Sequence, residues 1–113
     1  MMKRAGIVVT AAMLLVACGN SYDKAIDEVI KLENVSLKEP GLPENINELK
    51  RDKACTKVFD EGKVITITYE IRENDFVTEG FVKKNGDYKA GATEKDMKSA
   101  EPIYVENEDL CQN

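Results

Sequence analysis

Apolar and polar positions divide this chain into three parts with different spacings. Residues 5–16 form an apolar run behind the basic pair Lys3 and Arg4. From Tyr22 the apolar side chains recur every three or four positions, the spacing of a helix with one buried face. From Val58 the spacing changes to two, the period of a half-buried strand. The pattern therefore predicts an apolar leader, one amphipathic helix and then a sheet.

The predicted helix begins after Ser21, a favourable N-cap residue, with Asp23 in its first turn. It ends by Leu37, because the prolines and glycine at 40–43 cannot continue it. Residues 44–53 are polar and predict a loop with one helical turn. The apolar face of the helix is made of Tyr22, Ile26, Val29, Ile30 and, at the same spacing, Glu33.

We expect about four antiparallel strands after this loop. The predicted ranges are 58–59, 63–72, 76–84 and 87–90, followed by a helical turn at 93–97 and an extended piece at 103–105. Asn85 and Gly86 tolerate the positive φ of a tight hairpin turn, and Gly80 interrupts the alternation and predicts a bulge. The apolar face of the second strand contains Ile65, Ile67, Tyr69 and Ile71. An apolar helix stripe and an apolar sheet face can bury each other, which predicts a two-layer α+β domain with a curved antiparallel sheet.

The leader has the three parts of an export signal, and its last residues resemble a lipobox, Leu-Val-Ala-Cys at 15–18. A helix of twelve residues rises about 18 Å, short of the roughly 30 Å bilayer core. We therefore predict a cleaved lipoprotein signal peptide at 1–17, lipidated Cys18 with a short tether at 18–21, and one domain at 22–113. The alternatives are a plain secretory signal with an incidental cysteine, and a buried amino-terminal helix.

Acylation of Cys18 predicts where the protein lies. Two or more fatty chains, such as palmitate, hold a protein at a membrane for long times, whereas one holds it marginally. The expected location is the extracytoplasmic face of the cell membrane, with membrane lipid as the partner of the acylated Cys18.

The amino-acid composition excludes several kinds of binding and catalysis. Removal of residues 1–17 takes two of the 16 basic side chains, which leaves 14 basic and 21 acidic ones and a net charge of −7. Such an acidic domain is not expected to bind nucleic acid. The chain has no histidine, so Ser-His and Cys-His nucleophiles are excluded, and the commonest zinc ligand is missing. We expect no enzyme activity, no cofactor and no metal.

Cys55 and Cys111 form an even pair in an oxidising compartment, which favours a disulfide. The alternative is two small buried side chains that never meet. The acidic clusters at 73–75 and 106–109 suggest calcium, but neither has the ligand spacing or the glycine of an EF-hand loop. We expect them to be turn and terminal charges.

Four stretches together resemble the small cystatin-like fold lipoproteins of Gram-positive bacteria. They are LVACGN at 15–20, YDKAIDEVIK at 22–31, VFDEGKVITITYEI at 58–71 and FVKKNGDY at 81–88. The resemblance implies a cystatin-like fold and a surface location. Most members have no known function, and some act in conjugative entry exclusion by recognising a channel protein of the incoming transfer machine. The Gln-x-Val-x-Gly and Pro-Trp motifs of inhibitory cystatins are absent here, which argues against protease inhibition.

These observations predict a membrane-anchored, non-catalytic module that recognises an envelope protein. Entry exclusion is the specific form that the resemblance suggests. The alternative is a lipoprotein that binds a small ligand or a metal on the concave face of the sheet.

Overall fold

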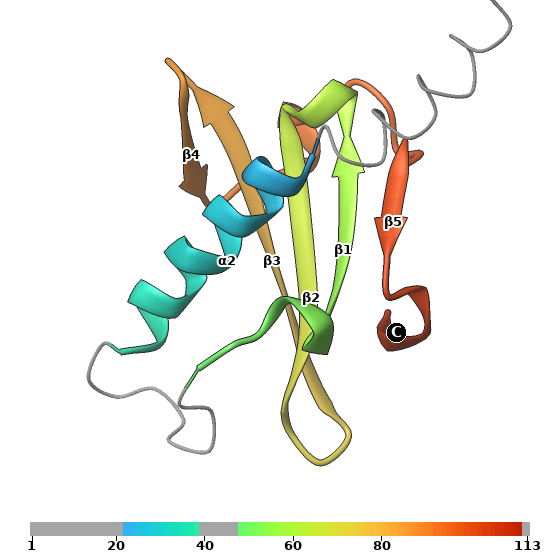
Figure 1. The fold of residues 1–113 in the computed structure, drawn as a ribbon. Helices are drawn as coiled ribbons and strands as arrows, with labels where there is room; N and C mark the ends of the chain where they lie inside the picture. The colour runs from blue at the N-terminus through green and yellow to red at the C-terminus, as the bar shows by residue number, and fades with distance from the viewer. Residues whose placement is uncertain (1–21, 39–47, 112–113) are drawn as a thin grey trace, which may run out of the picture.

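The helix α2, Asp23–Leu37, lies across one face of an antiparallel sheet in the computed structural model of the chain, which describes residues 22–38 and 48–111 (Figure 1). Ile26, Val29, Ile30 and Glu33 are its buried residues, at the predicted spacing. The helix ends at Leu37 as expected. The predicted N-cap, Ser21, lies outside the described residues.

Within the described ranges the sheet has five strands, in the order β4-β3-β2-β1-β5. Their bounds are β1 Ala54–Phe59, β2 Val64–Arg72, β3 Asp75–Lys84, β4 Asp87–Ala90 and β5 Tyr104–Glu106. Neighbouring strands are antiparallel throughout. The fold is therefore α+β, one helix on an antiparallel sheet, as predicted.

The expected number of strands was one too low. The extended piece predicted at 103–105 is a paired edge strand, because Val105 lies opposite Lys57 in the ladder between β5 and β1. Three residues are too few to show an alternating pattern on their own. The first strand is also longer than expected and begins at Ala54, because β1 lies between two partners that bury small and polar side chains such as Thr56.

The predicted bulge at Gly80 is wrong. Gly80 lies opposite Thr66 in regular register, and the register shifts between Glu70 and Arg72 instead. Gly80 instead allows a close approach of the segment after β4, since a Cβ there would lie 3.2 Å from the Cβ of Ala92, a tight contact. The amides of Gly91 and Ala92 both donate to the Gly80 carbonyl, at 2.9 and 3.1 Å.

Short turns connect β1 to β2, β2 to β3 and β3 to β4, whereas residues 91–103 connect β4 to β5. The 3₁₀ turns are η1 Arg51–Lys53, η2 Asp60–Gly62, η3 Glu94–Asp96 and η4 Glu108–Leu110. The predicted hairpin turn is present, since φ is 53° at Asn85 and 88° at Gly86. Thr93 and Asp96 form the predicted capping box around η3.

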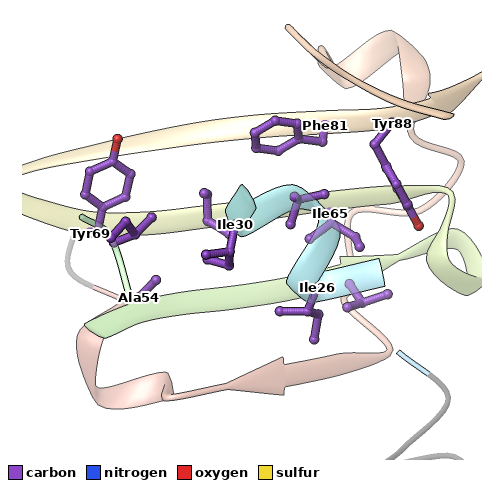
Figure 2. Packing of buried hydrophobic residues seen from close by; sticks show 11 residues of the cluster. Ile26, Ile30, Ala54, Ile65, Tyr69, Phe81 and Tyr88 are labelled. Atoms are coloured by element: carbon purple, nitrogen blue, oxygen red, sulfur yellow. The ribbon is translucent and has the colours of Figure 1, made fainter. Parts of the chain in front are cut away.

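Both faces of the sheet bury apolar side chains. Figure 2 shows Ile26 and Ile30 of α2 against Ile65, Tyr69 and Phe81 of the sheet. On the other face, a smaller cluster of Phe59, Val64 and Val82 is covered by Ala92 and Met97. The main core is therefore the layer between α2 and the sheet, and the segment after β4 protects the opposite face.

Candidate functional site

The layer between α2 and the sheet is filled with side chains. Ile26, Ile65 and Ile67 are fully buried, and Phe81 is 1 % exposed. Interiors packed in this way have few voids larger than a water molecule. The face of the sheet that the sequence suggested as a ligand site is thus occupied by the protein's own core.

One carboxylate lies at the border of this core. Glu33 of α2 is 7 % exposed and accepts a hydrogen bond from the Tyr69 hydroxyl of β2. Burial raises the pKa of Glu33, the Tyr69 hydrogen bond opposes that rise, and the charge of Glu79 adds to it. Burial and the neighbouring Glu33 also raise the pKa of Tyr69. Among the described residues, no ion pair joins Glu33 or Glu79 to a basic side chain. The environment therefore favours protonated Glu33.

A second polar cluster surrounds Arg51, in η1. Its guanidinium contacts Asp23 at 2.7 Å and Asp27 at 3.1 Å, and Nε lies 2.6 Å from Oε1 of Glu106. The Tyr104 hydroxyl donates to Oε2 of Glu106 at 2.9 Å. The hydrogen bonds from Arg51 hold the pKa of Glu106 below its ordinary value. Three carboxylates share this one cation, so the cluster joins α2, η1 and β5 and leaves no free positive charge for an anionic ligand.

Cys55 and Cys111 form a disulfide, with 5.0 Å between their Cα atoms. The pairing that the sequence predicts is therefore present, and it ties the end of the described chain to β1. Asn107 supports the same corner, because its side-chain amide donates to the carbonyls of Arg51 and Ala54, at 3.1 Å each.

Among the hollows lined by described residues, two lie on the outer surface beside α2. The larger, about 730 Å³, lies between α2 and residues 48–51 and is lined by apolar Ile30, Val35 and Leu49 with lysines at its rim. Both Lys38 and Glu48 line it, and these residues flank the segment 39–47, which lies outside the described residues. The smaller hollow, about 320 Å³, lies at the start of α2 beside η2. We assign no ligand to either hollow.

A family model for a domain of unknown function with a cystatin-like fold, DUF4467, matches residues 22–110. The chain belongs to the DUF4467 family. A crystal structure of a DUF4467 family protein from Staphylococcus aureus subsp. aureus Mu50 is similar, with a TM-score of 0.53 and 24 % identity over 77 % of this chain and 94 % of that one. No curated protein matches this chain. The cystatin-like fold implied by the sequence is therefore confirmed.

The DUF4467 domain begins where the predicted tether ends, and Cys18 lies outside the described residues. Of the predicted acidic clusters, Glu73 and Asn74 form the turn between β2 and β3, and Asp75 begins β3. In the second cluster, Glu106 is paired with Arg51. No group of three or more His, Cys, Asp or Glu in the described residues could hold a metal ion. None of the helices described there is long and apolar enough to cross a bilayer.

Sequence reasoning missed two features of the DUF4467 domain. Arg51 lies in a polar stretch with no pattern of its own, and only the positions of Asp23 and Asp27 one turn apart on the helix suggest a shared cation. The Glu33–Tyr69 pair had a weak signal, since Glu33 continues the apolar stripe. Two tyrosine contacts were not predicted either: Tyr88 is buried and donates to the Gly62 carbonyl, and the ring of Tyr22 packs 5.8 Å from that of Tyr104.

Proposed function

We propose that this DUF4467 protein is a lipid-anchored, extracytoplasmic module that recognises a protein of the cell envelope and performs no catalysis. The observation that carries the proposal is the Leu-Val-Ala-Cys motif, which stands four residues before the start of the domain at Tyr22. An export signal that ends in an acylated cysteine is the interpretation that this motif and the apolar run before it favour.

The short tether supports a role at the membrane surface. Four residues span at most about 14 Å when fully extended. The domain would therefore be held close to the lipid headgroups, with the start of α2 nearest the bilayer. In this arrangement the opposite end of the sheet, with the β2–β3 turn, faces away from the membrane (Figure 1).

The chemistry of the domain supports recognition over catalysis. The sequence contains no histidine that could act as a general base. The charge of Arg51 is neutralised by three carboxylates, and the carboxyl group of Glu33 is hydrogen-bonded to Tyr69. The packed layer under α2 weighs against the alternative of a small ligand or metal on the concave face. Binding through the outer surface is what the arrangement favours.

Substitution of Cys18 tests the proposal. Cys18→Ala removes the acylation site, so the protein should leave the membrane fraction of the native host. Asn20→Ala is the matched control, because it changes the tether and keeps the cysteine, and it should stay with the membrane. Full membrane association of Cys18→Ala would contradict the lipid anchor.

Conjugative entry exclusion is the concrete role to examine with the same pair of variants. Recipient cells that carry the wild-type chain or Asn20→Ala should accept a conjugative element less often than cells without it. Cys18→Ala should lose this effect, because the released domain no longer lies at the membrane. If the conjugative element enters all recipient cells equally often, a role in entry exclusion is contradicted.

A further inference from the structure

The outer edge of β3 is covered by β4 along only part of its length. β4 pairs with residues 81–84 of β3, and the amides of Gly91 and Ala92 reach the Gly80 carbonyl. From Asp75 to Glu79, no backbone group in the described part of the chain pairs with this edge. Figure 1 shows β4 beside only the upper part of β3, on the side away from β2.

The register of the ladder shows which groups face outward. The Lys83 amide points toward the β2 side and donates to the carbonyl of Lys63, the residue before β2. The Gly80 carbonyl points the other way and accepts from the segment that follows β4. Because both backbone groups of one residue point to the same side and alternate residues point to opposite sides, the even-numbered residues face the outer edge. The amides and carbonyls of Phe76 and Thr78 therefore point to the open side. Thr78 is also exposed.

On the face of the sheet that α2 covers, the open part of β3 carries two acidic side chains, Asp75 and Glu79. Glu79 and Val77 share a face with buried Phe81, because they lie two and four positions before it. The charge of the Glu79 carboxylate raises the pKa of Glu33, and Glu79 has no cationic partner in the described residues. Asp75 is held by Arg72 at 3.2 Å. Glu79 is thus the charge that an added strand would meet.

This charge pattern disfavours a second copy of the chain as the added strand. Antiparallel self-pairing that engages both Phe76 and Thr78 is centred on Val77 and sets Asp75 of one copy opposite Glu79 of the other. Like charges directly opposite each other destabilise a strand pair. Inward-pointing charges are also a known protection of exposed edges against self-association.

We propose that the β3 edge from Asp75 to Glu79 is the recognition surface of the protein, and that it binds an extended segment of a partner protein as an added strand. The segment would carry Lys or Arg opposite Glu79 and an apolar residue opposite Val77. Main-chain hydrogen bonds to Phe76 and Thr78 supply affinity, and the basic side chain supplies specificity. This inference rests on the proposed function as a recognition module.

A synthetic peptide with the sequence Ser-Lys-Thr-Val-Thr-Lys-Ser is the probe. Its lysines and valine lie on one face when it is extended, and the sequence reads the same in both directions, so either strand orientation meets Glu79. The same peptide with Glu in place of Lys is the charge control. Binding to the full chain in detergent is followed by fluorescence anisotropy, and amide hydrogen exchange is followed by NMR.

Thr78→Pro and Glu79→Lys are the test variants. Proline at 78 removes an outward-facing amide and leaves the ladder with β2 intact, whereas lysine at 79 repels the basic peptide. Ala90→Pro blocks the outward edge of β4 and Glu101→Lys reverses a remote exposed charge, so these two are the matched controls. If Thr78→Pro fails to fold, Glu79→Lys carries the test.

The lysine peptide should protect the amides of Phe76 and Thr78 from exchange. Both test variants should bind it about tenfold more weakly, the change expected on losing a hydrogen bond or an ion pair, and both controls should bind it as the wild type does. Equal binding by a test variant, equal binding of the acidic peptide, or protection of the two amides in the free chain would overturn the inference. Because these readouts do not depend on the lipid, failure here is distinct from failure of the Cys18→Ala test.

Discussion

Glu33 is a carboxylate in a place where an apolar side chain would otherwise complete the helix stripe. The Tyr69 hydroxyl supplies a hydrogen bond, but burial dominates and raises the pKa of Glu33 above its ordinary value. A raised pKa in the folded state means that the protonated acid folds more favourably than the carboxylate. The stabilisation is complete below the ordinary pKa of a glutamate and is lost as the pH rises through the folded value.

Replacing Glu33 by glutamine tests this environment. Glu33→Gln keeps the shape and a hydrogen-bonding oxygen but carries no charge, so the variant should have a larger free energy of unfolding than the wild type at pH 7. At pH 4 the two proteins should differ little, because Glu33 is then protonated. Denaturant unfolding at both pH values measures the difference. A variant less stable than the wild type at pH 7 would contradict the account, and Glu101→Gln, at an exposed position, is the control.

The contacts of single residues were harder to predict from the sequence than the helix and the strands. Cys55 and Cys111 could be paired because only two cysteines remain after Cys18 and because an exported chain favours disulfides. The contacts of Arg51 could not be predicted, since they bring together residues that are 24 to 55 positions apart in sequence. Long-range polar contacts of this kind have no local sequence period.

At the scale of elements, hydrophobic spacing predicted most of the fold. The helix stripe and the alternation along β2 are long enough to be read directly, and Ile65, Ile67 and Tyr69 are buried as expected. The prediction of a half-buried strand holds only in part, because Val64 and Thr68 on the other face are buried as well and Ile71 is half-buried. The limits of this reasoning appear at β5 and at the start of β1. There the strand is defined by the partner beside it, not by its own side chains.

The packing between α2 and β2 predicts how much a core substitution should lower the free energy of unfolding. Ile67 is fully buried, so Ile67→Ala should lower the free energy of unfolding by about 2 to 5 kcal/mol through lost burial and the cavity left behind. Val35 lies on the same helix–sheet unit but is 60 % exposed, and Val35→Ala should change stability by less than about 0.5 kcal/mol. Denaturant unfolding of the two variants checks both values. Similar losses for both would mean that the layer is not the core.

At the scale of the whole molecule, the two ends of the domain differ in their expected surroundings. The start of α2 follows the predicted tether, whereas the β2–β3 turn and the disulfide lie toward the opposite end. The open part of β3, from Asp75 to Glu79, is at that opposite end as well. A partner approaching from outside the cell would therefore meet the open edge first.

The family and the fold rest on residues 22–110, and the location rests on the residues before them. The sequence pattern of the leader is the basis for the membrane anchor, and every functional proposal for this domain depends on that location. The chemistry at Cys18 is thus the central claim.

Intact mass spectrometry of the protein isolated from its native host tests this claim most directly. We predict a chain that begins at Cys18, carries diacylglycerol on that sulfur, and lacks the two thiol hydrogens of Cys55 and Cys111. A chain that retains residues 1–17, or one that begins elsewhere with an unmodified Cys18, would contradict the account.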